Sequence, residues 1–121
     1  MPVFSVQFAP NGDCLYSGGR DAQLKVWDML TYSLIQNIPA HLFAINSIAY
    51  HPSRPFFATA SMDKTVKIWE ADTLKLAKTI SREKGYDSHR LSVNKVVWDE
   101  DILISVGDDK KVIIWNCLFD D

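Results

Sequence analysis

The sequence lacks the features that define several protein classes. Its apolar runs are far shorter than the roughly 20 residues that cross a bilayer, so we expect no membrane-spanning helix and no membrane partner. Its 13 basic and 15 acidic side chains leave a net charge of −2, which disfavours a nucleic-acid partner. It has two cysteines, Cys14 and Cys117, whose positions match no metal-ligand spacing. We expect both to be small apolar fillers in a cytoplasmic protein without a metal.

Two further absences narrow the fold and the chemistry. No segment shows a sustained 3.6-residue apolar periodicity, so helices are not expected. No glycine-rich loop stands between a strand and a helix, so nucleotide binding by that route is not expected. We expect no cofactor. Met1 leads at once into patterned sequence, and we expect no signal or transit peptide. The composition, with 47% hydrophobic and 23% charged residues, is typical of a globular protein, and we expect a single domain over residues 1–121.

What the sequence does contain is a pattern repeated three times. Trp27, Trp69 and Trp115 each close a short stretch of alternating apolar residues, such as Val-Lys-Ile-Trp before position 70. The spacings are 42 and 46 residues (69 − 27 and 115 − 69). Self-similarity at this period is typical of a repeat architecture, in which each unit packs against the next.

Alternation with a period of two residues dominates the rest of the chain, and turn residues such as Pro, Asn, Gly and Asp interrupt it. The pattern predicts eleven short strands, at about 3–8, 13–18, 22–28, 32–38, 45–50, 56–61, 65–70, 74–80, 92–98, 101–106 and 110–117. Strands this short and even indicate an all-β antiparallel fold, and the long repeat period favours a propeller over a sandwich. Repeat units are expected at about 3–38, 41–80 and 89–117. The first two have four strands, named a to d, and the third lacks its outer strand d.

Polar residues recur at fixed offsets from the three tryptophans. An aspartate lies six residues before each tryptophan: Asp21, Asp63 and Asp109. A hydroxyl lies four residues before each aspartate: Ser17, Thr59 and Ser105. A histidine precedes two of these groups: His41 and His89.

These residue types predict a buried hydrogen-bonded network in each unit. We expect the aspartate in the tight turn between strands b and c, where its short side chain accepts backbone N–H bonds. The hydroxyl and the tryptophan lie near each other on strands b and c, and the histidine arrives from the loop before strand a. A chain of hydrogen bonds follows, from carboxylate to imidazole, to hydroxyl, to indole N–H, in which every group has a partner. We expect each complete set to stabilise the fold by about 1–3 kcal/mol.

The pattern resembles the WD-repeat family of β-propellers, over essentially the whole chain. By that resemblance, two units carry a full structural tetrad: His41, Thr59, Asp63 and Trp69, then His89, Ser105, Asp109 and Trp115. The first unit supplies only three members, Ser17, Asp21 and Trp27, because its histidine would precede Met1. The sequence departs from the family at the usual Gly-His and Trp-Asp dipeptides, which read Ala-His, Ser-His, Trp-Glu and Trp-Asn at most copies. Neither departure touches the tetrads.

An aspartate, a histidine and a hydroxyl in this order also resemble a hydrolase triad. The interpretation as a structural staple is stronger, because the group occurs twice and its hydroxyl is expected to bond the tryptophan indole. No free nucleophile and no oxyanion hole would remain. We therefore expect no enzyme and no catalytic residue.

The resemblance implies that partners dock on the narrow face, which the d–a loops, the b–c turns and the start of strand a form. The positions of this sequence on that face are Arg20, Phe43, Asn46, Met62, Leu91, Asn94 and Asp108. Met62 is expected either as a partner contact or as a core filler. Their mixed character suits a protein or peptide, with Phe43 and Arg20 as the expected anchors. Lys25 and Lys67 are expected on solvated strand faces.

Three blades are fewer than the four to eight of complete propellers, so the first and third units should each present a bare apolar face. The chain is expected to be a fragment of a larger propeller, to assemble with copies of itself or with companion blades, or to persist as an open arc. The sequence thus predicts a non-catalytic protein-interaction scaffold. The alternative is a catalytic or ligand-binding propeller domain that further blades complete, and nucleic-acid association through a larger assembly is a third, disfavoured reading.

Overall fold

The computed structural model describes residues 1–117 and 119, and every regular element in these residues is a β-strand. The strands are, in chain order, β1 Val3–Phe8, β2 Cys14–Gly19, β3 Gln23–Asp28, β4 Leu34–Pro39, β5 Ile45–Tyr50, β6 Phe56–Ser61, β7 Val66–Glu70, β8 Leu76–Ile80, β9 Val93–Asp99, β10 Ile102–Gly107 and β11 Val112–Asn116. Each begins and ends within two residues of a predicted strand.

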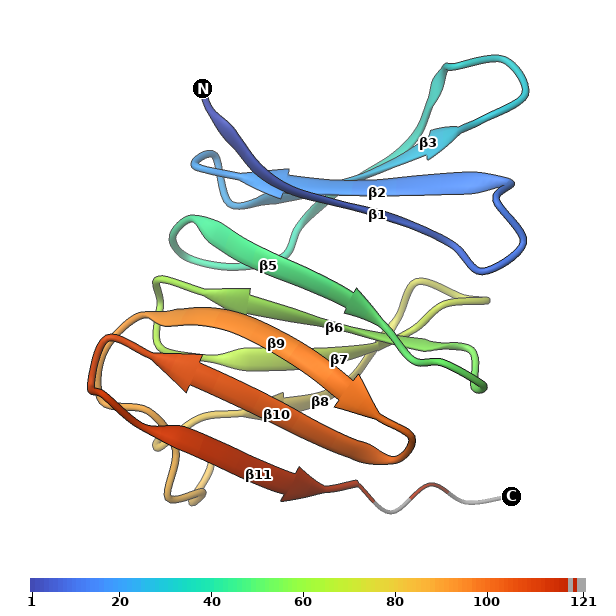
Figure 1. The fold of residues 1–121 in the computed structure, drawn as a ribbon. Helices are drawn as coiled ribbons and strands as arrows, with labels where there is room; N and C mark the ends of the chain where they lie inside the picture. Colours follow the sequence, from blue (N-terminus) through green and yellow to red (C-terminus); the bar gives the residue numbers. More distant parts are fainter. Residues whose placement is uncertain (118, 120–121) are drawn as a thin grey trace.

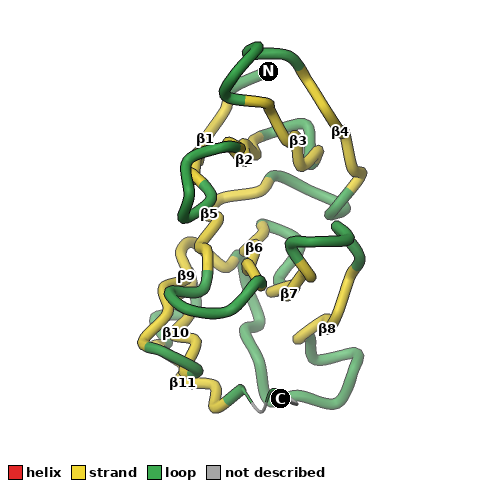
Figure 2. The backbone as a smooth tube through the Cα atoms, turned by 90° about the vertical axis from the view of Figure 1, so that its right-hand side faces the viewer, coloured by secondary structure: helices red, strands yellow, loops and turns green. Residues whose placement is uncertain are grey.

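The strands form three antiparallel sheets that are stacked in the order of the chain (Figure 1). Blade 1 has the order β1-β2-β3-β4, blade 2 the order β5-β6-β7-β8, and blade 3 the order β9-β10-β11. The first strands β1, β5 and β9 lie along one edge of the stack, and the outer strands β4 and β8 lie along the opposite edge (Figure 2). This arrangement confirms the predicted fold class, an all-β partial propeller of two four-stranded blades and one three-stranded blade.

The turns between strands b and c repeat the same backbone geometry in all three blades. The residue directly after the turn aspartate is left-handed each time, with φ of 64° at Ala22, 75° at Lys64 and 65° at Lys110. Each of these residues donates its backbone N–H to the carbonyl oxygen three residues earlier, at 3.2 Å. The third strand of each blade therefore begins after the left-handed residue, one or two residues later than predicted.

Two apolar cores lie between the blades, one in each junction. In the first, Tyr16 and Leu24 of blade 1 pack with Ile45, Phe57 and Trp69 of blade 2. In the second, blade 2 contributes mainly small and branched side chains, which pack against blade 3. Each face of blade 2 is thus covered by a neighbour, which is how propellers bury apolar surface.

The outer faces of blades 1 and 3 are apolar and exposed in this chain, as predicted. On β1, Phe4, Val6 and Phe8 are 46%, 61% and 56% exposed. On β11, Val112 and Ile114 are 67% and 66% exposed. Contiguous apolar patches of this kind mark interaction surfaces.

Candidate functional site

The b–c turns form one end of the stack, and their aspartates organise it. In each turn the Oδ1 atom accepts the backbone N–H two residues later, as in Asx turns. The N···O distances are 3.1 Å from Gln23 to Asp21, 3.0 Å from Thr65 to Asp63 and 3.4 Å from Lys111 to Asp109. The aspartate therefore shapes the turn in every blade, with or without a histidine partner.

In blade 2 the four residues of the sequence pattern form a continuous chain of hydrogen bonds. Nδ1 of His41 lies 2.8 Å from Oδ2 of Asp63, and Nε2 lies 2.7 Å from Oγ1 of Thr59. The indole N–H of Trp69 donates to the same hydroxyl at 3.0 Å. A neutral imidazole that donates from Nδ1 and accepts at Nε2 satisfies all four groups.

Further donors surround the Asp63 carboxylate, whose side chain is 4% exposed. The hydroxyl of Thr65 donates to Oδ1 at 2.6 Å, and the backbone N–H of Leu42 donates to Oδ2 at 3.1 Å. Burial raises the pKa of Asp63, but the bonds from His41, Thr65 and Leu42 together lower it further, so the net pKa is well below its usual range. The carboxylate is charged and held in place by several donors.

Blade 3 repeats this network. His89 lies 2.9 Å from Oδ1 of Asp109 and 2.8 Å from Oγ of Ser105, and the indole N–H of Trp115 donates to Ser105 at 3.1 Å. Burial raises the pKa of Asp109, while bonds from His89 and from the backbone N–H of Arg90 lower it below its usual value overall. A Cβ atom at Gly107 would lie 2.7 Å from Nδ1 of His89, so the histidine packs directly on this glycine.

Blade 1 contains only part of the network. The indole N–H of Trp27 donates to Oγ of Ser17 at 3.0 Å. Whereas Asp63 and Asp109 contact a histidine, Asp21 contacts a lysine: its Oδ2 atom lies 3.5 Å from Nζ of Lys25, and the Asp21 side chain is 33% exposed. The structure therefore brings together two full tetrads and, in blade 1, a Ser17–Trp27 pair, while Asp21 pairs with Lys25.

The predicted rim residues fall into two groups. Four residues are exposed at the b–c end of the stack: Arg20, Phe43, Met62 and Leu91. The other three are engaged within the protein. The amide nitrogen of Asn46 donates across the blade junction to Ser92 at 3.0 Å and to Val93 at 2.9 Å, and Asn94 donates to Asp108 at 2.7 Å.

The structure also shows residues that the sequence reasoning missed. Leu42 is 84% exposed beside Phe43, and its backbone is fixed by Asp63. Nζ of Lys67 donates to the carbonyl of Ala40 at 2.6 Å, which differs from the solvated position expected for it. The proximity of Leu42 to a tetrad histidine was a usable signal, whereas nothing in the repeat pattern indicated the Lys67 contact.

A second missed cluster joins blades 2 and 3 at the other end of the stack. The buried His51 lies 2.8 Å from Oδ1 of Asp101, and Arg54 holds both oxygens of the same carboxylate at 2.9 Å and 3.2 Å. These bonds, from Arg54 first and also from His51, lower the pKa of Asp101 below its usual value. No equivalent residues occur in blade 1, so the repeat pattern carried no signal for this cluster.

Over residues 1–117 and 119, no group of three or more His, Cys, Asp or Glu side chains has the arrangement of a metal site. Within the same residues, no helix is long and apolar enough to cross a membrane. Cys14 and Cys117 are both half-buried and carry free thiols.

The family match follows the geometry of the blades. Residues 1–28, 32–70 and 80–116 match the family described as WD domain, G-beta repeat. The chain belongs to the WD-repeat family. Each matched segment ends one residue after a tetrad tryptophan, and the second and third begin near the outer strand of the preceding blade.

Among curated proteins, the chain is similar to the human Kinesin-like protein KIF21B, with 33% identity over 109 residues, which are 89% of this chain and 6% of that protein. It is also similar to Protein transport protein sec13 of Aspergillus fumigatus, with 33% identity over 113 residues, 83% of this chain and 35% of the relative. A solved structure described as "Structure of U3-55K" superposes with a TM-score of 0.83 at 19% identity, over 94% of this chain and 34% of that one, and shows the same fold. The chain spans about a third or less of the length of these proteins.

Proposed function

We propose that this chain is a non-catalytic protein-interaction scaffold that presents the b–c end of its blades to a protein or peptide partner. The observation that carries the proposal is a set of exposed apolar side chains mounted on a rigid polar network. Phe43 and Met62 are 59% and 47% exposed, yet the Phe43 carbonyl and the Met62 backbone N–H are both hydrogen-bonded within the protein.

The attachment of these side chains is local and specific. The hydroxyl of Ser61 donates to the carbonyls of Phe43, at 3.1 Å, and of Ala44, at 2.8 Å. The backbone N–H of Met62 donates to the same Ala44 carbonyl at 2.9 Å. The two anchors therefore sit in a fixed relation, so that little conformational entropy is lost when a partner binds. Arg20 and Leu91 extend this rim, and Asn46, Asn94 and Asp108 support it.

The polar network itself supports the non-catalytic part of the proposal. The hydroxyls of Thr59 and Ser105 belong to residues that are 0% exposed, and each is already bonded to a histidine and an indole. A nucleophile must be reachable by its substrate. The tetrads are accordingly proposed as structural staples.

We further propose that the chain is one propeller segment, with units at about 3–38, 41–80 and 89–117, inside a larger ring. The bare face of β1 in blade 1 and that of β11 in blade 3 are the two ends at which further blades would add. Those blades belong to a longer protein, to a second copy or to a companion chain. Mass measured by light scattering during size-exclusion chromatography discriminates these cases, and a well-folded monomer would contradict the need for added blades.

The same proposal places the chain in the cytoplasm with a protein partner rather than a nucleic acid or a membrane. Two free thiols suit a reducing compartment. A net charge of −2 offers no broad basic surface. Weak and salt-insensitive retention on a heparin column is the expected result.

The rim is tested by affinity capture with three forms of the chain, followed by mass spectrometry. The double variant Phe43→Ala/Met62→Ala removes the anchors, and Leu30→Ala is the matched control, since Leu30 is 88% exposed in the β3–β4 turn at the opposite end of the blade. We expect a partner that the unaltered chain and the control retain and the double variant loses by tenfold or more. Equal retention by the double variant would contradict the proposed rim.

A further inference from the structure

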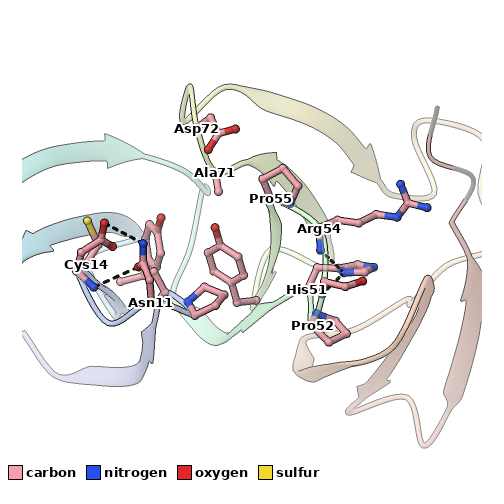
Figure 3. A pocket seen from close by; sticks show the side chains of 14 residues that line it. Asn11, Cys14, His51, Pro52, Arg54, Pro55, Ala71 and Asp72 are labelled. Carbon is pink, nitrogen blue, oxygen red and sulfur yellow. Dashed lines mark hydrogen bonds between the residues drawn. The ribbon is translucent and has the colours of Figure 1, made fainter. Parts of the chain in front are cut away.

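A cavity of about 560 Å³ lies at the junction of blades 1 and 2, at the end of the stack opposite the b–c turns. Its walls are the β1–β2 loop, the β5–β6 loop and the β7–β8 turn (Figure 3). This volume falls within the range of ligand-binding pockets. Because both blades belong to this chain, the walls are complete without any added blade.

The floor of the cavity is aromatic and firmly packed. Tyr16 is 4% exposed and stacks on Phe57 with ring centroids 4.7 Å apart. The ring of Tyr50 lies 5.9 Å from that of Tyr16. Both tyrosines line the cavity, and neither hydroxyl has a hydrogen-bond partner among the described residues. Tyr16 as a whole is almost fully buried, but its hydroxyl oxygen reaches the cavity, where it is open to a hydrogen bond from a ligand.

Two aspartates also line the cavity, one from each blade. Asp13 comes from the β1–β2 loop and Asp72 from the β7–β8 turn. Burial first, and then the negative charges of both aspartates among the neighbouring groups, raise the pKa of Tyr16 and the pKa of Tyr50. The phenols thus remain neutral, and the two aspartates line the same cavity as the two tyrosines.

Arg54 also lines the cavity, but its guanidinium already contacts other groups of the protein. Arg54 holds both carboxylate oxygens of Asp101, and its guanidinium lies 5.1 Å from the centre of the Phe119 ring. It extends away from Asn11 and Cys14 (Figure 3). Asn11 donates its amide to Asp13 at 3.2 Å. Asp72 accepts no hydrogen bond from any described residue, so an unused acceptor remains at the cavity mouth.

We infer that this cavity binds an arginine side chain of a peptide partner. A guanidinium has five N–H donors and no acceptor, which matches a site whose open groups are carboxylates and phenol oxygens. It also lies favourably against aromatic rings. An anionic ligand would meet two aspartates and no uncommitted cation. The inference rests on the proposed function, because the arginine belongs to the scaffold's partner, and it adds a second contact on the face opposite the rim.

The direct test is titration of the full chain, carrying ¹³C-labelled tyrosine, with N-acetyl-arginine amide. We expect the ring resonances of Tyr16 and Tyr50 to shift with saturation, and those of Tyr32 and Tyr86 to stay in place as internal controls. The neutral isostere N-acetyl-citrulline amide should produce no saturable shift. Equal shifts with both amides, or shifts spread over all four tyrosines, would overturn the inference.

Two variants assign the binding to the named groups. Asp72→Asn should weaken arginine amide binding about threefold at low salt, since an exposed ion pair contributes modestly. Tyr16→Phe removes only the hydroxyl and should weaken it by a similar factor. Asp87→Asn is the control, because Asp87 is an exposed aspartate paired with Arg82 outside the cavity, and should leave the affinity unchanged. Unchanged affinity in both Asp72→Asn and Tyr16→Phe would also overturn the inference.

The test of arginine binding in the cavity and the test of partner binding at the rim can succeed or fail independently. Saturable arginine binding together with capture that does not depend on Phe43 and Met62 would support the cavity and contradict the rim. Rim-dependent capture with no arginine binding would overturn the cavity and leave the scaffold proposal standing.

Discussion

The polar groups of blades 1 and 2 begin from the same residue types and end in different environments. In blade 2, the Asp63 side chain is 4% exposed, and His41, Thr65 and a backbone N–H all donate to it. In blade 1, the Asp21 side chain is 33% exposed and faces Lys25 across 3.5 Å. Yet both aspartates cap the same b–c turn with a bond of about the same length, 3.0 Å and 3.1 Å.

This comparison separates two roles that one residue type fills in the repeat. Shaping the turn needs only the aspartate, because the left-handed residue and the Asx bond occur in all three blades. Joining the turn to the preceding loop needs the histidine, which brings strands b and c and the d–a loop into one network. The two rim anchors of blade 2, Phe43 and Met62, are attached to this region.

The largest difference is expected from removal of the turn carboxylate itself. Asp63→Ala should lower the free energy of unfolding by about 3 kcal/mol, since it leaves several buried donors without a partner. Urea unfolding followed by tryptophan fluorescence measures the change. Asp109→Ala should act in the same direction. A loss of any catalytic turnover in a variant that remains stably folded would contradict the structural role of these residues.

Substitution of the tryptophans should also lower the free energy of unfolding more in blade 2 than in blade 1, by a smaller amount than removal of the turn carboxylate. Trp69 is 5% exposed and packs in the core between blades 1 and 2, so Trp69→Phe should lower the free energy of unfolding by about 2 kcal/mol. Trp27 is only half-buried, although its indole N–H donates to Ser17, and Trp27→Phe should lower the free energy of unfolding by about 1 kcal/mol or less. Equal losses at the two sites would remove the distinction between the blades.

Acid should weaken the complete networks of blades 2 and 3. Because the folded-state pKa of Asp63 lies below its unfolded value of about 4, the carboxylate stabilises the fold above that pH. This stabilisation is lost as the pH falls through 4 towards the folded-state pKa. Thermal unfolding between pH 6 and pH 3 should therefore show a decline that is flatter in Asp63→Asn. A decline of the same slope in that variant would show that other groups govern acid unfolding.

The smallest effect is expected at the partial network. Asp21→Asn keeps an oxygen that can accept the Gln23 N–H and removes only a half-exposed ion pair with Lys25. The free energy of unfolding should change by less than about 0.5 kcal/mol. A larger loss, measured by the same urea titration, would mean that the Asp21 carboxylate makes an interaction that contributes more to stability than its ion pair with Lys25.

Features that repeat could be predicted from the sequence, and features that occur once could not. The offsets among Trp69, Thr59 and Asp63 recur in the first and third units, and a histidine at a similar distance recurs in the third, so the pattern placed strands, turns and network residues together. The Asp101 cluster and the Tyr16–Tyr50 cavity depend on how two neighbouring blades meet. Such contacts join residues from different repeats, and no internal copy reports them.

The rim shows the same limit on a smaller scale. Phe43 and Met62 lie where the pattern predicts and are exposed. Asn46 was predicted as a partner contact, but its amide bridges two blades, because its position at the start of β5 faces Ser92 and Val93 of the next unit. The offset within one repeat predicts where a side chain begins, and the neighbouring blade decides what it bonds.

A double-mutant cycle between His41 and Asp63 tests the central claim most directly. Unfolding free energies of the unaltered chain, His41→Ala, Asp63→Ala and the double variant give the coupling energy, and a parallel cycle between His41 and Asp21 is the control. We predict a coupling of about 2 kcal/mol for the first pair and none beyond about 0.3 kcal/mol for the second. Additive losses for His41 and Asp63 would contradict the claim that the two residues act as one staple beneath the rim.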